Sequence, residues 1–238
     1  MTPAKRQPSP RRPAATRAAR PGGAGRPRPN RPGARSRTLP IVAGVVGLVV
    51  LLAIVAALVA GGDDDSDDGA LSVAPVTVEG ASLPRYTGPG DDPAVGAAAP
   101  RLVGVDVTGA AAEAGGASGS PQLLVFVAHW CPHCQAEVPR IVEWMRDGQA
   151  PDGLEVTAVV TGTDSSLPNY PPSEWLADEG WAGGVVLDDE RFSAGDAYGL
   201  SAYPFLVAVA PDGSVTARAS GELPPDELSA LVAGAVAG

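Results

Sequence analysis

The sequence predicts an α/β domain, in which helices cover both faces of a mixed sheet, preceded by one N-terminal transmembrane helix. Three observations lead to this prediction: apolar strand-like runs alternate with helical segments after about residue 96, residues 41–60 are uninterruptedly apolar, and the charge changes sign across that run. Strands that alternate with helices and end in an antiparallel hairpin are typical of a sheet buried on both faces. The chain divides accordingly at 1–38, 39–61, 62–95 and 96–238.

The apolar run at 41–60 consists only of Ile, Val, Ala, Gly and Leu. As a helix, twenty such residues reach roughly 30 Å, the thickness of the hydrocarbon core of a bilayer. A helix of a globular core would need a polar face, which this run lacks. A cleaved signal peptide is the alternative, but the leading region is long and the run exceeds the usual ~7–15 apolar residues. We therefore expect an uncleaved anchor over 39–61.

The charge distribution predicts the orientation of this anchor. Eleven of the 17 basic residues precede residue 40, whereas all 27 acidic residues follow residue 62. By the positive-inside rule, the N-terminus lies in the cytoplasm and the rest of the chain lies outside the cell membrane. The tail at 1–38 has too few large apolar residues to fold and is expected to be disordered near anionic lipids. The acidic remainder offers no surface to nucleic acid.

The segment at 62–95 is expected to be an acidic, Pro/Gly-rich linker, because its aspartates repel one another and its prolines interrupt regular structure. Only 73–78 is a candidate short strand. In the following domain, Ser173 is expected to cap a short helix. The expected strands are 102–107, 123–128, 154–160, 185–187, 205–210 and 214–219; the expected helices are 132–147, 173–177, 191–198 and 225–237; and 109–121 is expected to be a loop.

All cysteines and histidines of the chain lie within six positions, where the strand at 123–128 leads into the helix at 132–147. Two cysteines separated by two residues at such a junction indicate redox chemistry. At Cys131 the helix N-terminus and the neighbouring His133 favour the thiolate. Pro132 suits the first helical turn. Cys134 lies one turn further into the helix and is expected to be the shielded, resolving thiol.

The domain at 96–238 resembles a known family through four sequence motifs. They are Gly96-Ala97-Ala98-Ala99-Pro100, the strand that ends in Trp130-Cys131-Pro132-His133-Cys134, the Glu137-Val138-Pro139 that follows it, and Tyr198-Gly199-Leu200-Ser201-Ala202-Tyr203-Pro204-Phe205-Leu206-Val207. On these motifs, the domain is similar to the thioredoxin-fold domain of the membrane-anchored TlpA/ResA-like thiol–disulfide oxidoreductases. That fold is a thioredoxin-like three-layer α/β/α arrangement around a mixed sheet.

The resemblance implies a role for several residues. Cys131 and Cys134 would exchange a disulfide with partner proteins, and Glu137 would be the active-site glutamate that exchanges a proton with Cys134. Pro204 would be the cis-proline that shapes a substrate groove together with Tyr203, and Trp130 would provide a flat apolar surface beside Cys131. No dissociable cofactor is needed. The implied partners are extracytoplasmic thiol or disulfide proteins and a transmembrane electron donor or acceptor.

Two features depart from the family pattern. Pro132-His133 resembles the dipeptide of DsbA oxidases, which favours oxidation, and Tyr203 stands where Thr or Val is usual. The 70 residues from Cys134 to Pro204 are too few for the helical insertion of DsbA proteins. The direction of electron flow therefore stays open.

Other interpretations of the same residues remain. Cys131 and Cys134 could form a structural disulfide, although so short a loop stabilises little. They could bind copper or another metal together with His129 and His133, although four ligands within six positions converge poorly on a tetrahedron. Glu137 could be an exposed helix carboxylate, and Pro204 could be trans. His129 could equally be a solvated residue at the strand end, and we assign it no role.

Overall fold

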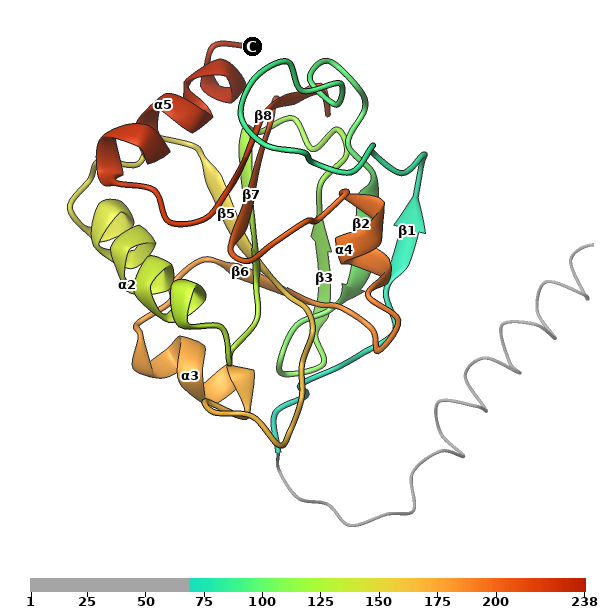
Figure 1. The fold of residues 1–238 in the computed structure, drawn as a ribbon, viewed down its shortest axis with the longest axis vertical. Helices are drawn as coiled ribbons and strands as arrows, with labels where there is room; N and C mark the ends of the chain where they lie inside the picture. The colour runs from blue at the N-terminus through green and yellow to red at the C-terminus, as the bar shows by residue number, and fades with distance from the viewer. Residues whose placement is uncertain (1–68) are drawn as a thin grey trace, which may run out of the picture. The chain divides into compact units, whose positions relative to one another are not determined.

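The computed structural model describes residues 69–238, whose central feature is a five-stranded mixed sheet with the strand order β6-β5-β4-β7-β8. Strands β4, β5 and β6 are parallel, while β7 and β8 continue the sheet antiparallel (Figure 1). The strands are β4 (Gln122–Val127), β5 (Glu155–Val160), β6 (Gly184–Leu187), β7 (Phe205–Val209) and β8 (Val215–Ser220). Each predicted strand of this sheet is confirmed with small shifts at its ends.

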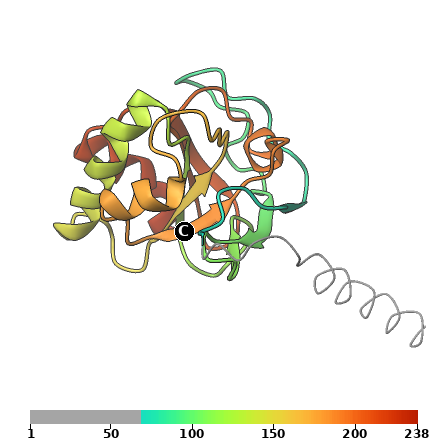
Figure 2. The same ribbon diagram turned by 90° about the horizontal axis from the view of Figure 1, so that it is seen from below.

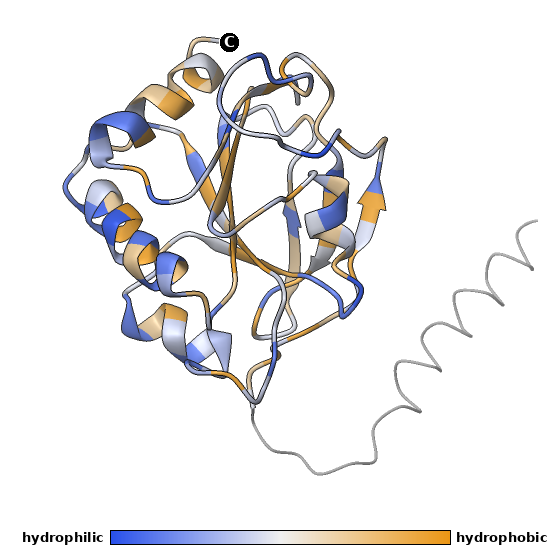
Figure 3. Cartoon of the chain, viewed as in Figure 1, coloured by the Kyte–Doolittle hydropathy of each residue, from blue (hydrophilic) through white to orange (hydrophobic). Residues whose placement is uncertain are grey.

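Central strand β4 is buried on both faces, as its continuous apolar sequence predicts. Leu123, Val125 and Val127 point into one apolar cluster, whereas Leu124 and Phe126 point into the other. Figure 3 shows the apolar residues concentrated along these central strands, while the helices carry both polar and apolar positions. The sheet therefore separates two hydrophobic cores.

One face of the sheet is covered by helices α2 (Pro132–Arg146), α3 (Pro172–Asp178) and α5 (Pro225–Val236). The other is covered by the short helix α4 (Ser193–Ala197) and by a second, three-stranded antiparallel sheet (Figure 2). The predicted thioredoxin-like α/β fold with a mixed sheet is thus present. The second covering layer is built more from strands than from helices.

The second sheet corrects two expectations. Its strands are β1 (Thr77–Glu79), β2 (Arg101–Val105) and β3 (Ala111–Ala114). We expected an edge strand of the main sheet at 102–107, but β2 instead lies between β1 and β3. We expected a loop over 109–121, but Ala111–Ala114 pairs with β2. Alanine and glutamate carry little strand signal, so only the pairing with β2 reveals this strand.

The predicted linker at 62–95 is wrong over its described part, because residues from Ala74 onward pack onto the domain. Leu83, Tyr86 and Ala94 are buried in the second core, and β1 pairs with β2. Arg218 of β8 is fully buried and binds Asp92 and the carbonyl oxygen of Pro84. The prolines and charges that suggested a linker are interspersed with a few widely spaced apolar residues, which pack onto the domain.

Two smaller expectations also have an outcome. The helix near 173–177 is confirmed as α3, but it begins at Pro172 and its N-cap residue is Pro171, so Ser173 does not cap it. Over residues 69–238, no helix is long and apolar enough to cross a membrane. The predicted tail and the predicted span at 41–60 lie outside the described residues.

Arg218 provides a test of whether residues 84–92 belong to the fold. Arg218→Met should lower the free energy of unfolding by about 3–5 kcal/mol, since it leaves the Asp92 carboxylate and two backbone carbonyls without their buried partner. Arg218 lowers the pKa of Asp92. The ion pair therefore stabilises the fold at pH values above the ordinary pKa of an aspartate. This contribution is lost as the pH falls through the lowered pKa of Asp92.

Urea unfolding of the full chain at pH 7 and at low pH measures this effect. The matched control is Arg146→Met, which breaks only exposed ion pairs and should change stability by less than about 0.5 kcal/mol. Equal stabilities of the two variants would show that residues 84–92 contribute nothing to the domain.

Candidate active site

The two cysteines lie at the N-terminus of α2. Cys131 is the N-cap residue, and its backbone N–H donates to the carbonyl of Ala128, while Pro132 occupies the first helical turn. Both cysteines are free thiols. Cys131 is 7% exposed and Cys134 is fully buried. The structure thus confirms the predicted helix start, and it makes Cys131 the accessible member of the pair.

Cys134 is held as a neutral thiol by its surroundings. Burial raises the pKa of this thiol, and the neighbouring Cys131 and Glu137 raise it further. A buried thiol with a raised pKa does not attack unless a proton acceptor is available. This combination suits a thiol that reacts second, after a disulfide has formed on its neighbour.

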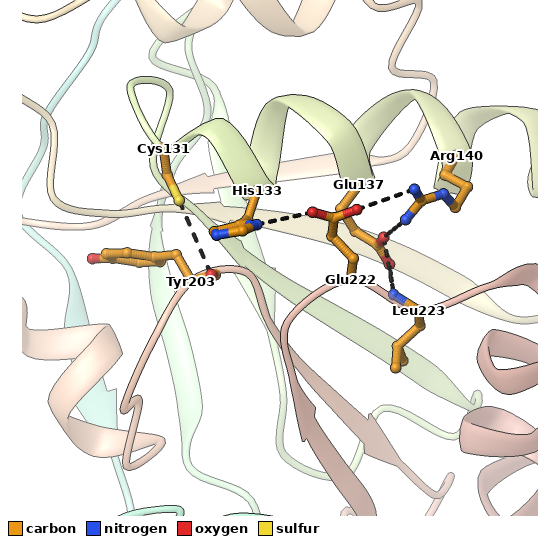
Figure 4. A network of polar contacts seen from close by, with 7 residues as sticks. All are labelled: Cys131, His133, Glu137, Arg140, Tyr203, Glu222 and Leu223. Carbon is orange, nitrogen blue, oxygen red and sulfur yellow. Dashed lines mark hydrogen bonds and ion pairs between the residues drawn. The ribbon is translucent and has the colours of Figure 1, made fainter.

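The loop before β7 faces Cys131. The Tyr203–Pro204 peptide bond is cis, which confirms the prediction for Pro204. The Sγ atom of Cys131 lies 4.0 Å from the carbonyl oxygen of Tyr203 (Figure 4). The Tyr203 backbone is thus next to the reactive sulfur, at a place where a bound extended segment would lie.

The side chains of Tyr203 and Trp130 form an aromatic wall beside Cys131. Their rings meet edge to face, with centroids 6.0 Å apart, and the indole Nε1 donates to the carbonyl of Gly162 at 2.7 Å. Burial raises the pKa of Tyr203 to about 12, so its phenol remains neutral. Trp130 therefore has the apolar position that its proposed role requires.

A groove of about 470 Å³ continues this wall away from Cys131. Two of its apolar side chains, Leu167 and Phe192, are 38% and 46% exposed. Phe192 has a φ of +62°, a left-handed conformation that is uncommon for a bulky residue. The lining residues are Trp130, Gly162, Thr163, Asp164, Ser165, Leu167, Glu190 and Phe192.

His129 is fully buried, so the interpretation as a solvated residue at the strand end is wrong. Its Nδ1 donates to the carbonyl of Pro168 at 2.6 Å, and its Nε2 accepts from the backbone N–H of Asp164 at 3.2 Å. Both ring nitrogens are thus occupied. His129 fastens the loop at 162–171 to the end of β4, which positions the groove.

Glu137 is fully buried, so the alternative of an exposed helix carboxylate is wrong. Its two carboxylate oxygens accept from the backbone N–H of Leu223 at 3.2 and 3.1 Å, and Oε2 also accepts from Arg140 at 2.9 Å. Burial nevertheless raises the pKa of Glu137, because it outweighs these hydrogen bonds. A carboxyl group with a raised pKa near a buried thiol can take up and release a proton.

His133 is largely exposed and contacts a residue that the sequence did not single out. Its Nδ1 lies 2.9 Å from Oε1 of Glu222, whose Oε2 accepts from Arg140 at 3.1 Å (Figure 4). Arg140 could have been anticipated, since it follows Glu137 by one helical turn. Glu222 could not, because 89 residues separate it from His133 and no local pattern marks it.

The metal-binding interpretation gains no support from residues 69–238, where no three His, Cys, Asp or Glu side chains are grouped so as to hold a metal ion. Within this region both imidazoles already have protein partners.

Comparison with known proteins adds the family. The Redoxin family model matches residues 94–233, which include both cysteines, Glu137 and Pro204. The chain belongs to the Redoxin family. Together with the paired thiols, this membership confirms the predicted enzyme class, a thiol–disulfide oxidoreductase.

Several solved structures match this chain. A Chlorobium tepidum protein assigned as thiol:disulfide interchange protein DsbE is 22% identical, with a TM-score of 0.51 over 60% of this chain and 97% of that one. A secreted Mycobacterium tuberculosis disulfide oxidoreductase is 21% identical, with a TM-score of 0.46 over 55% and 93%. StoA of Bacillus subtilis is 20% identical, with a TM-score of 0.46 over 58% and 98%. The likeness to the C. tepidum structure shows a shared fold.

The difference between the two thiols predicts their order of modification. Iodoacetamide should alkylate Cys131 in the Cys134→Ser variant at least about tenfold faster than Cys134 in the Cys131→Ser variant, since access and thiolate fraction are both lower at Cys134. Mass spectrometry of the two reduced, folded variants at pH 7.5 measures both rates. Equal alkylation rates of the two thiols in the folded proteins would contradict this assignment.

Proposed function

We propose that this chain is a membrane-anchored thiol–disulfide oxidoreductase that acts outside the cytoplasm and exchanges the Cys131–Cys134 disulfide with partner proteins through a mixed disulfide. The observation that carries the proposal is the pairing of a thiol at a helix N-terminus that is 7% exposed with a fully buried thiol one turn further on. This arrangement separates an attacking sulfur from a resolving one.

In the reducing direction, the thiolate of Cys131 attacks one sulfur of a partner disulfide. A new S–S bond forms to that sulfur, the partner's own S–S bond breaks, and the released thiolate takes up a proton. The Cys134 thiol then loses its proton and attacks Sγ of Cys131. The mixed disulfide breaks, and the partner leaves as a dithiol with two electrons and two protons. The oxidising direction runs through the same steps in reverse.

Glu137 is the proton acceptor for Cys134 in this scheme. Cys134 is buried away from water, and Glu137 is the carboxylate whose charge contributes to its raised pKa. Because burial also raises the pKa of Glu137, the carboxyl group can hold a proton closer to neutral pH than an exposed glutamate.

The partner segment would bind in extended form beside the Tyr203 carbonyl, which lies next to Cys131. Trp130 and Tyr203 offer it an aromatic surface, and the groove beyond them has Asp164 and Glu190 among its lining residues but no basic side chain. A partner segment with apolar and basic residues near its cysteine fits this surface best.

The location outside the membrane rests on the apolar run at 41–60 and on the opposite charges of its flanks. There a transmembrane electron donor would keep the pair reduced, whereas an acceptor would keep it oxidised. We propose that Pro132-His133 makes the pair a better oxidant of partner thiols. A positive charge beside Cys131 stabilises the thiolate, and with it the reduced form of the pair.

Substitution of each cysteine tests the exchange reaction. Cys131→Ser should abolish reduction of insulin disulfides by the full chain, whereas Cys134→Ser should accumulate mixed disulfides that non-reducing gels reveal. Full activity of Cys131→Ser would refute the enzyme mechanism.

A second prediction concerns Glu137. Glu137→Gln should slow resolution of a mixed disulfide by roughly 100-fold, since general acid–base catalysis contributes about that much. In the native protein, the rate of resolution should also rise with pH as Glu137 ionises, at a pH above the usual pKa of a glutamate. The variant should lack this rise. Stopped-flow mixing with a disulfide peptide over a range of pH measures both effects.

The control for this experiment is Glu143→Gln, an exposed carboxylate on the same helix that should leave the profile unchanged. If Glu137→Gln retains the native rate and pH profile, Glu137 has only a structural role.

A further inference from the structure

Four consecutive residues, at 220–223, contact both halves of the active site. They lie where β8 ends and before α5 begins, and each bonds to a different part of the site. On the side of the cis-proline loop, Ser220 Oγ donates to the carbonyl of Ala202 and the Gly221 N–H donates to the carbonyl of Pro204. On the side of α2, the Glu222 carboxylate binds His133 and Arg140, and the Leu223 N–H donates to Glu137. We call them the 220–223 turn. It joins the cis-proline loop to the helix that carries the cysteines.

Glu222 is the charged residue of this turn. Its two carboxylate oxygens bind two different side chains, His133 at 2.9 Å and Arg140 at 3.1 Å, and Arg140 in turn binds the buried Glu137. One carboxylate therefore links the residue between the cysteines to the carboxyl group behind them. The carboxylate itself is one-third exposed.

The contact between Glu222 and His133 determines which nitrogen of the imidazole carries a hydrogen. An ionised carboxylate can only accept hydrogen bonds, so Nδ1 of His133 must be the donor in both the neutral and the charged ring. Nε2 is then the nitrogen that gains and loses a proton. In Figure 4 this second nitrogen lies on the Cys131 side of the ring.

The same contact is an ion pair whenever the ring is protonated, and the hydrogen bonds from His133 and Arg140 lower the pKa of Glu222, so its carboxylate is the ionised partner. The charged and titratable groups near the ring are Cys131 on its own helix, Glu222, and Arg140 behind that carboxylate. The negative charge of Glu222 acts against a thiolate at Cys131. It is, however, balanced by Arg140, whereas the second nitrogen of His133 lies on the Cys131 side of the ring.

We propose that Glu222 is a positioning residue that fixes the Nδ1–H tautomer of His133, holds Nε2 on the Cys131 side and pairs with the ring when it is charged, and thereby makes the Cys131–Cys134 pair a stronger oxidant. This inference rests on the proposed function, because it assigns the control of that same redox pair. Glu222 touches neither sulfur and acts through His133.

Two substitutions of Glu222 separate orientation from charge. Glu222→Ala removes the acceptor, so the neutral His133 ring should change to the Nε2–H tautomer, which ¹⁵N NMR of the full chain in detergent detects directly. Glu222→Gln retains an acceptor oxygen without the charge, and it should keep the Nδ1–H tautomer. A native tautomer in Glu222→Ala would overturn the proposal, and this readout requires no partner protein.

The reduction potential tests the consequence for the cysteines. In equilibrium with glutathione, both variants should shift the pair towards the disulfide by roughly two- to fivefold, the range expected for losing an exposed ion pair. In a His133→Ala background, Glu222→Ala should cause no further shift, because its effect passes through the imidazole. An equal shift in both backgrounds, or no shift in either, would overturn the proposal.

The control is Glu113→Ala, which removes a more exposed carboxylate from an ion pair with Arg101 on the small sheet. It should alter neither the tautomer of His133 nor the glutathione equilibrium. Failure of the proposed enzyme function would appear separately, as wild-type protein without insulin reduction.

Discussion

A buried carboxylate holds the active site together. Glu137 extends from α2 into the protein interior, where an unpartnered carboxylate would be very unfavourable. It is accommodated because Leu223 and Arg140 both donate to it. Satisfying this one group fixes the start of α5 against α2 and places Glu222 beside His133. The geometry around the two cysteines thus depends on a polar contact between segments 86 residues apart in sequence.

The rest of the site is arranged around this contact. Helix α2 presents Cys131 at its N-terminus, the cis-proline loop brings a backbone carbonyl to within 4.0 Å of that sulfur, and His129 ties down the loop that borders the groove. These parts are positioned by the hydrophobic clusters on the two faces of the sheet, between which β4 is fully buried. The fold therefore provides a rigid frame, and the polar contacts set the reactivity.

The sequence predicted those features that depend on local or repetitive patterns. The strands of the main sheet were recognisable from their apolar runs, and α2 from Pro132 and the spacing of its apolar residues. Cys131 and Cys134 stood out by their spacing, and Pro204 by its resemblance to a family motif. These signals lie within about fifteen residues of the structure that they predict.

The features that the sequence missed all depend on distant contacts. Strand β3 is composed of Ala and Glu and is stabilised by its pairing with β2. Residues 74–94 looked like a linker because their few anchors, such as Leu83 and Tyr86, are widely spaced. His129 looked solvated because its two partners lie 35 and 39 residues away. Glu222 carries no mark in the sequence, since only the fold brings it to His133.

The scaffold and the dipeptide between the cysteines differ in what they say about the direction of electron flow. The resemblance to TlpA/ResA-like proteins fits either direction of electron flow, whereas Pro132-His133 with Glu222 favours an oxidising pair. The described part of the chain is strongly acidic, with 22 acidic and 6 basic residues. Such a surface would steer basic partners towards the site and repel acidic ones.

The most direct test of the central claim is a redox titration of the full chain against glutathione, followed by mass spectrometry. The account predicts one reversible two-electron transition that joins Cys131 to Cys134 with the loss of two hydrogens, at a potential above the ≈ −270 mV of thioredoxin. A pair that stays as two thiols across the whole range of glutathione poise, or that forms only disulfides between separate chains, would contradict it.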